Sequence, residues 1–212
     1  MDIVDPRVEA YMRGLQARHD EPVLIEMEAE GERRGFPIVG RNVGVTLELL
    51  ARAVGARRVF EMGSGFGYSA YWFARAAGET GEVHCTDGDP ANEAAALGYL
   101  GRAGFADRIH YHVGDAVSEL AKVHGEFDVV YDDIDKDGYP AAWAAARERV
   151  RLGGLYICDN VIWSGRVPDD GEAPDRVTGA IREHNAAIAA DERYLSTIVP
   201  TRDGVMVALR IA

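Results

Sequence analysis

The sequence predicts an α/β fold: a doubly wound, mostly parallel seven-stranded sheet that ends in an antiparallel C-terminal hairpin. From residue 57 to residue 160, short apolar runs alternate with segments of helical spacing. These runs are nearly continuous in apolar residues, as in parallel strands that are covered on both faces. The last two runs are separated only by the turn TRDG, residues 201–204. Strands joined by so short a turn must be antiparallel.

The segment before the first strand is polar and helix-prone. Apolar side chains recur at helical spacing over residues 5–34. Residues 43–54, VGVTLELLARAV, have an amphipathic helical pattern that ends at Gly55. We therefore expect an N-terminal helical segment, residues 1–35, and then a helix that leads into the sheet.

The strands and helices of the sheet region follow in regular order. Five parallel strands are predicted at 57–63, 82–87, 108–115, 127–133 and 152–160. Helices are predicted between them at 68–78, 90–104, 117–123 and 141–150. A helix at 176–190 and strands at 194–200 and 205–211 complete the chain. No linker or low-complexity tract divides these elements, so residues 1–212 are expected to form a single domain.

The composition narrows the possible function classes. The formal net charge of −12 argues against a nucleic-acid or anionic-membrane partner, because both would repel the chain. Cys85 and Cys158 each lie inside an apolar run, which favours buried thiols in a reducing compartment. The N-terminus has no signal-peptide pattern, and no apolar segment is long enough to span a bilayer. We expect a cytoplasmic enzyme or binding domain for a small molecule.

The first strand–helix turn, EMGSGFGYS at Glu61–Ser69, is rich in glycine. Doubly wound sheets bind ligands at the carboxyl ends of their strands. Glycines followed by a helix N-terminus allow a ligand to approach backbone N–H groups closely. The spacing here is G-x-G-x-G, whereas a dinucleotide pyrophosphate site has G-x-G-x-x-G. Taken alone, the turn is also compatible with a purely structural connection.

Two further strand ends complete a predicted nucleoside site. Asp87 ends the second strand, where a carboxylate can accept both ribose hydroxyls. The alternative is a turn or helix-capping aspartate, since Asp89-Pro90 follows. An adenine could lie at Gly114-Asp115-Ala116, after the third strand. Glu61 would repel a pyrophosphate but suits a cationic amino group, so the set favours S-adenosylmethionine over NAD.

The stretch YDDIDKDGYPA, Tyr131–Ala141, places four aspartates and a lysine at the end of a buried strand. The pattern D-x-D-x-D-G matches the start of an EF-hand calcium loop. The bidentate glutamate required at the twelfth loop position is Ala144 here, and Pro140 interrupts the loop. The preceding element is also a strand rather than a helix. An EF-hand is therefore rejected.

A different metal site can be built with the next strand. Asp159 and Asn160 end that strand, so their side chains can meet Asp133 at the same sheet edge. Carboxylate and amide oxygens suit Mg²⁺, and Mn²⁺ or Ca²⁺ would also be accepted. Lys136 could act as a general base, because a nearby divalent cation disfavours its ammonium form. The alternative is a set of polar loop residues, with Lys136 a solvated surface lysine.

Together these segments resemble the cation-dependent O-methyltransferases, the family that includes catechol and caffeoyl-CoA O-methyltransferases. The matching segments are FEMGSGFGYSA, the aspartate of HCTDGDP, VGDA, YDDIDKDGY, GGLYICDNVIWSGRV and VPTRDGVMVAL. They span about residues 36–212, and the pair D-x-D-K-D-x-Y and D-N-x-x-W-x-G-x-V is specific to that family. The resemblance implies a class I S-adenosylmethionine-dependent methyltransferase with a Rossmann-like fold, and it implies a homodimer.

The resemblance also implies roles for individual positions. Lys136 would take the hydroxyl proton next to Asp133, and the metal ligands would be Asp133, Asp159 and Asn160. Trp163 and Ser164 would meet the acceptor. The implied cofactor-binding residues are Val39, Glu61, Gly63, Ser64, Ser69, Asp87, Ala116, Asp133 and Asp135. In that set Glu61, Gly63 and the two serines would bind the methionine end, Asp87 the ribose and Ala116 the adenine.

The chain departs from the family pattern at Asp132, where the family usually has an apolar residue. Asp132 is therefore a second candidate metal ligand, although the D-x-D-K register favours Asp133. Residues 1–35 match only loosely and are candidates for acceptor-site or dimer contacts. The predicted acceptor is a small vicinal-dihydroxy, catechol-like molecule. Alternatives are a non-aromatic diol such as a sugar or antibiotic, an NAD(P)-dependent oxidoreductase, or a non-catalytic nucleoside- or metal-binding module.

Overall fold

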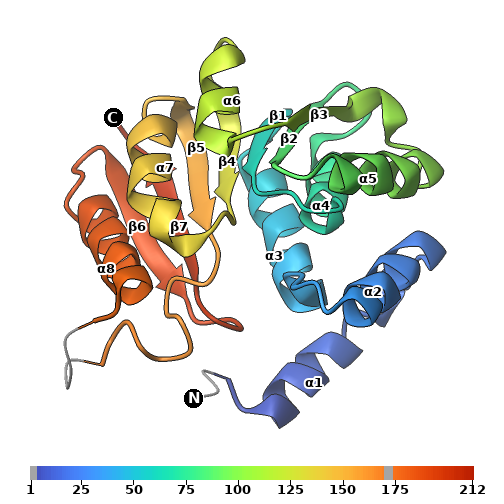
Figure 1. Ribbon diagram of the computed structural model, residues 1–212, viewed down its shortest axis with the longest axis horizontal. Coiled ribbons are helices and arrows are strands. Elements are labelled where there is room, and N and C mark those ends of the chain that lie inside the picture. Colours follow the sequence, from blue (N-terminus) through green and yellow to red (C-terminus); the bar gives the residue numbers. More distant parts are fainter. Residues whose placement is uncertain (1–3, 170–173) are drawn as a thin grey trace.

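The computed structural model describes residues 4–169 and 174–212, and these form a seven-stranded sheet flanked by helices (Figure 1). The strand order is β3-β2-β1-β4-β5-β7-β6. Strands β1 to β5 are parallel, and β7 is antiparallel to both β5 and β6. The strands are β1 (Arg58–Met62), β2 (Glu82–Asp87), β3 (Ile109–Val113), β4 (Phe127–Asp132), β5 (Val150–Cys158), β6 (Tyr194–Val199) and β7 (Val205–Arg210). The predicted fold class is confirmed.

Helices cover both faces of the sheet. The neighbours Val59 and Phe60 of β1 belong to different apolar clusters, because successive side chains of a strand point to opposite faces. One cluster packs α3, α4 and α5 against the sheet, and the other packs α6, α7 and α8 against it. The helices are α1 (Pro6–Gly14), α2 (Pro22–Arg34), α3 (Gly40–Ala53), α4 (Tyr68–Ala77), α5 (Pro90–Arg102), α6 (Ala116–Lys122), α7 (Tyr139–Ala146) and α8 (Arg176–Ala189), with short 3₁₀ turns η1 (Ala17–His19), η2 (Ala106–Arg108) and η3 (Lys136–Gly138).

The N-terminal helices are attached to the turn after β1 by buried polar contacts. Arg41 of α3 is buried and pairs with Glu28 of α2, with 3.0 Å between Nη2 and Oε2, and also with Asp20. The Tyr68 hydroxyl donates to the same Glu28 carboxylate at 2.8 Å. The first three residues of the predicted segment 1–35 lie outside the described ranges. Within those ranges, no helix is long and apolar enough to cross a membrane.

Two predicted helix boundaries differ clearly from the structure. The helix predicted at 43–54 begins earlier, at Gly40. The predicted helix 141–150 is too long, because α7 ends at Ala146 and the chain then enters β5. Arg149 explains the difference: its guanidinium donates to the Gly125 carbonyl at 2.6 Å, and its own carbonyl accepts from Phe127 N at 2.7 Å. These bonds draw the backbone into the sheet before the helix-favouring residues end.

Candidate active site

A cavity of about 580 Å³ opens at the carboxyl ends of the parallel strands. The strand order reverses between β1 and β4 at this edge, which is where doubly wound sheets bind ligands, and the volume is typical of a ligand pocket. The wall combines the strand ends with the segment before α3 and the turn between β6 and β7. The wall residues that the sequence predicted are Val39, Gly63, Ser64, Ser69, Asp87, Ala116, Asp133, Asp135, Lys136, Asp159 and Asn160.

The glycine turn after β1 touches the acidic loop after β4. Gly63 has a φ of 82°, and a Cβ at this position would lie 2.6 Å from the carbonyl oxygen of Asp133. In the other direction, Asp133 N donates to the Met62 carbonyl at 2.9 Å. Only glycine combines this backbone angle with so close an approach. The turn therefore lies directly against a predicted metal ligand.

Glu61 is fully buried and lies behind the cavity wall rather than in it. Among the described residues, neither of its carboxylate oxygens has a hydrogen-bond partner. Burial raises the pKa of Glu61 to about 7, although the neighbouring Ser69 and Ser64 hydroxyls oppose the shift. A buried carboxylate with so little hydrogen bonding is destabilising. An ammonium group from a bound ligand would offset that cost, so the environment of Glu61 fits the predicted contact.

Asp87 lines the cavity at the end of β2, where three protein donors hold its carboxylate. These donors are Gly65 N at 3.1 Å, Asp89 N at 2.8 Å and Asn92 Nδ2 at 3.1 Å. The capping role considered for this region belongs to Asp89, which accepts from Ala91 N at 2.8 Å at the start of α5. The Asp87 side chain is therefore fixed at the wall and retains lone pairs for a ligand.

The three predicted metal ligands converge at the other end of the cavity. Asp133 follows β4, Asp159 and Asn160 follow β5, and all three line the wall. Asp159 is 1% exposed, and its Oδ1 has no hydrogen-bond partner in the described part of the chain. Burial raises the pKa of both carboxyl groups, and repulsion from Asp133 adds to the shift at Asp159. Two carboxylates and an amide at one end of a cavity fit a hard divalent cation, which would give Asp159 its missing partner.

Lys136 is joined to this acidic group. Its Nζ donates to Asp133 Oδ1 at 2.9 Å and to the Ile134 carbonyl at 3.2 Å. Burial alone would lower the pKa of Lys136, but the Asp133 carboxylate outweighs burial and the pKa lies above its ordinary value. The side chain is only 15% exposed. Lys136 is therefore not the solvated surface lysine of the alternative interpretation.

Trp163 and Ser164, the predicted acceptor contacts, do not line the cavity. They lie in the loop after β5, and Ser164 N donates to Asp203 Oδ1 at 2.5 Å, which ties this loop to the turn between β6 and β7. Across the described chain, the non-glycine residues with positive φ are these two, Asn160 and Arg202. All four lie in the loop after β5 or in this adjoining turn. Strained backbone of this kind gathers at functional sites.

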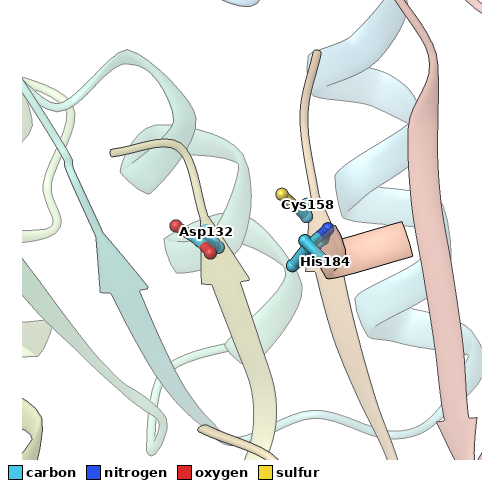
Figure 2. A group of neighbouring side chains, drawn as sticks. All are labelled: Asp132, Cys158 and His184. Atoms are coloured by element: carbon cyan, nitrogen blue, oxygen red, sulfur yellow. The ribbon is translucent and has the colours of Figure 1, made fainter. Parts of the chain in front are cut away.

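Asp132, the second candidate ligand, points to the opposite face of the sheet. It is fully buried and accepts from the Tyr156 hydroxyl at 2.7 Å, and this hydroxyl lies 2.9 Å from His184 Nε2. Figure 2 shows Asp132 on β4, Cys158 on β5 and His184 on α8, with potential ligand atoms within 4.8 Å of one another. Hydrogen bonding through Tyr156 accounts for this cluster without a metal. Burial raises the pKa of Asp132 to about 7.

Several wall residues were missed by the sequence analysis. Phe36 and Ile38 precede α3, Tyr68 begins α4, and Arg202 lies in the turn between β6 and β7. The Nη1 group of Arg202 donates to the Ile38 carbonyl. One signal could have revealed Arg202: its turn precedes β7, the neighbour of β5, and so lies at the same sheet edge as Asp159.

Known proteins resemble this chain in sequence and architecture. The model of the O-methyltransferase family matches residues 18–211. The catechol O-methyltransferase of Niastella koreensis is 32% identical over 95% of this chain and 96% of its own. The caffeoyl-CoA O-methyltransferase of Petroselinum crispum is also 32% identical, over 98% of this chain and 86% of its own. The crystal structure of TomG, an O-methyltransferase from Streptomyces achromogenes involved in tomaymycin synthesis and solved with SAM, has a TM-score of 0.84, 27% identity and 91% coverage of each chain. This chain therefore belongs to the O-methyltransferase family, among the class I S-adenosylmethionine-dependent methyltransferases.

Proposed function

We propose that this O-methyltransferase is divalent-cation-dependent and transfers the methyl group of S-adenosylmethionine to one hydroxyl of a small vicinal-dihydroxy aromatic acceptor. One observation carries the proposal. A continuous cavity joins the glycine turn and Asp87 to the group formed by Asp133, Lys136 and Asp159. Family membership excludes the NAD(P)-dependent oxidoreductase considered from the sequence.

The proposed cofactor region is the wall at the ends of β1, β2 and β3. When bound, S-adenosylmethionine supplies an electrophilic methyl group on its sulfonium. Glu61 would accept hydrogen bonds from the amino group, Asp87 from the ribose hydroxyls, and Ala116 would contact the adenine. The remaining proposed cofactor contacts are Val39, Gly63, Ser64, Ser69, Asp133 and Asp135.

The proposed cation ligands are Asp133, Asp159 and Asn160, and Lys136 is the proposed base. When bound, a divalent cation such as Mg²⁺ supplies charge that lowers the pKa of an adjacent hydroxyl. Lys136 would take the hydroxyl proton at Nζ. A cation on Asp133 would weaken the ion pair that now raises the Lys136 pKa, and it would make Nζ a better base. Because this ion pair directs Lys136 toward the proposed ligands, it argues against a non-catalytic module.

The acceptor class is proposed from the names of relatives and from the position of Lys136 beside the proposed cation ligands. Relatives at 32% identity are named for catechol and caffeoyl-CoA, both acceptors with adjacent hydroxyls. One hydroxyl at Lys136 and its neighbour beside Asp159 would orient such a ring toward the glycine turn. Transfer would then depend mainly on proximity and orientation. Trp163 and Ser164, in the adjoining loop, are the proposed acceptor contacts outside the cavity wall.

Calorimetry and methyl-transfer assays test this proposal. We expect S-adenosylmethionine to bind without added metal, and catechol or caffeate to be methylated only with Mg²⁺. EDTA should abolish turnover, and excess Mg²⁺ should restore it. Turnover that persists in chelator would show that the cation-dependent mechanism is wrong. Turnover with non-aromatic diols alone would select the other acceptor class, and a failure to bind S-adenosylmethionine would contradict the cofactor site.

We also propose that the chain forms a homodimer through the outward face of α1. Val8, Tyr11 and Leu15 recur at helical spacing and are 48%, 68% and 61% exposed. An apolar stripe of this kind marks an interaction surface. Tyr11→Glu should convert a dimer to a monomer in light scattering coupled to size exclusion. Leu152→Glu, at a similarly exposed apolar position, is the matched control; a monomeric wild-type protein would contradict the proposal.

A further inference from the structure

The charges on the cavity wall are strongly unequal. Lys136, one of the two wall cations, is already paired with Asp133 at 2.9 Å. Arg202 is the other, and within the described part of the chain it forms no ion pair. Its guanidinium is therefore the wall cation that remains for an anionic ligand. The wall carboxylates are Asp87, Asp115, Asp133, Asp135 and Asp159.

The Arg202 side chain is held at the wall by its own backbone and by a bond to a distant segment. Its Nη1 donates to the Ile38 carbonyl. Its φ is 50°, a left-handed conformation that is costly for any residue with a Cβ and nearly free of cost for glycine. The turn geometry alone would favour glycine at this position. The shape of the turn therefore does not explain an arginine at this position, whereas the contact made by its side chain does.

Topology places this guanidinium on the acceptor side of the cavity. Arg202 precedes β7, which pairs with β5, whereas the proposed cofactor contacts lie mainly at β1, β2 and β3. Its positive charge favours the ionised forms of both Asp133 and Asp159. The adjacent Asp203 also binds the loop that carries Ser164. Arg202 thus adjoins the proposed cation ligands and the loop beside them.

We propose that Arg202 selects acceptors that carry a carboxylate in addition to the vicinal diol. This inference rests on the proposed function and deepens it by assigning a charge to the acceptor. A carboxylate would be repelled by the acidic remainder of the wall, so Arg202 is its partner. The planar guanidinium can bind a carboxylate through two parallel hydrogen bonds. A neutral catechol gains nothing from this contact.

Steady-state kinetics with three acceptors that share one diol test the inference. The acceptors are 3,4-dihydroxybenzoate, catechol and 3,4-dihydroxybenzylamine. For the wild-type enzyme with Mg²⁺, kcat/KM should be highest for the acid, about 10- to 100-fold above catechol, and should also exceed that for the amine. With saturating Mg²⁺, Arg202→Gln should raise KM for the acid by a similar factor, leave its kcat little changed, and bring kcat/KM for the acid close to that for catechol.

Further variants of Arg202 distinguish the effect of its charge from the effect of its backbone conformation. Arg202→Lys keeps the charge and should retain part of the preference, whereas Arg202→Gly relaxes the backbone and should lose the preference as fully as Arg202→Gln. Arg102→Gln, at the opposite end of α5 from the cavity, should behave as wild type.

Four results would overturn the inference. Equal kcat/KM for the acid and catechol in the wild-type enzyme would do so, as would an equal loss for all three acceptors in Arg202→Gln; both leave the proposed function intact. A weaker calorimetric affinity for S-adenosylmethionine in Arg202→Gln, with an unchanged acceptor preference, would assign the residue to the cofactor instead. No methyl transfer to any of the three compounds would overturn the proposed acceptor class and the inference with it.

Discussion

At Asp133 the two ends of the cavity meet, because its backbone contacts the glycine turn and its carboxylate pairs with Lys136. Asp133→Ala should abolish cation-dependent turnover while S-adenosylmethionine still binds. The loss of activity should exceed about 10- to 100-fold, which is the usual loss when a group that only hydrogen-bonds to a metal ligand is changed. Calorimetry with Mg²⁺ and with cofactor, together with turnover, measures both effects. Asp137→Ala, in the same loop but outside the wall, is the control; full turnover of Asp133→Ala in chelator would refute the role.

Lys136→Ala should lower kcat more than it raises KM. General-base catalysis contributes about 10²- to 10⁴-fold, so a loss in this range is expected. The loss should be greatest at low pH, because the acceptor hydroxyl ionises without a base as the pH rises. A pH profile of kcat measures this, with Lys122→Ala on the surface of α6 as control. A rate that equals wild type at every pH would leave Lys136 only a structural role.

Residues at strand ends were easier to predict than residues in turns. Asp133 and Asp159 each follow an apolar strand, and parallel pairing brings the ends of such strands to one edge. Arg202 reaches the cavity only because β7 pairs with β5, and Tyr68 is fixed by Glu28 of α2. Both depend on contacts between distant segments, which leave no local pattern in the sequence.

At the scale of elements, the turn between β1 and α4 depends on Gly63. Gly63→Ala should destabilise the fold by at least about 1–2 kcal/mol, because its φ of 82° is left-handed and its Cβ would meet the Asp133 carbonyl. For a chain of this size each kcal/mol lowers Tm by about 2–4 °C. Gly98→Ala, with open space around its Cβ inside α5, should be neutral or stabilising. Equal Tm values for the two variants would contradict this account.

The strands were predicted well because buried parallel strands have nearly continuous apolar sequences. The end of α7 was predicted wrongly, because the helix-favouring residues continue past Ala146 into residues that pair with β4. The bonds of Arg149 to Gly125 and Phe127 decide that boundary. They are tertiary contacts, and local propensity cannot anticipate them.

For the whole molecule, buried titratable groups set the pH dependence of stability. Burial raises the pKa of Glu61 and Asp132 to about 7 and also raises that of Asp159. In the unfolded chain these carboxyl groups ionise near pH 4, so between about pH 4 and pH 7 they keep protons in the folded state, and through them the free energy of unfolding falls as the pH rises. Above about pH 7 Glu61 and Asp132 would each cost on the order of 3–4 kcal/mol. His84 and His184 act in the opposite direction below about pH 6.5, because burial lowers their pKa to about 4.

Urea unfolding in EDTA at about pH 5 and pH 8 measures this fall. Asp132→Asn should flatten the dependence while keeping an acceptor for Tyr156. Mg²⁺ should raise Tm more at pH 8 than at pH 5, because at the lower pH the cation must displace a proton from Asp159. An Asp132→Asn variant whose pH dependence equals that of the wild-type protein would contradict the assignment.

The Tyr156 hydroxyl has a single proton, yet it lies between two groups that accept one. Asn185 Nδ2 donates to the Val161 carbonyl at 2.9 Å, which turns its Oδ1 toward His184 Nδ1 at 3.1 Å. The hydrogen-bond network therefore assigns the ring proton to Nδ1 and leaves Nε2 as an acceptor. While Asp132 on the other side is ionised, the hydroxyl donates to its carboxylate; once Asp132 is protonated, it can donate to the hydroxyl oxygen, and Nε2 can then accept the tyrosine proton.

Burial raises the pKa of Asp132 to about 7, so below that pH the uncharged acid predominates. Asp132 ends β4, and the next residue, Asp133, is paired with Lys136. Of these two aspartates, only Asp133 then attracts a divalent cation. The neutral Asp132 neither competes for the ion nor adds a negative charge beside it. The proton that Asp132 holds on one face of the sheet therefore limits the negative charge beside the proposed cation ligands.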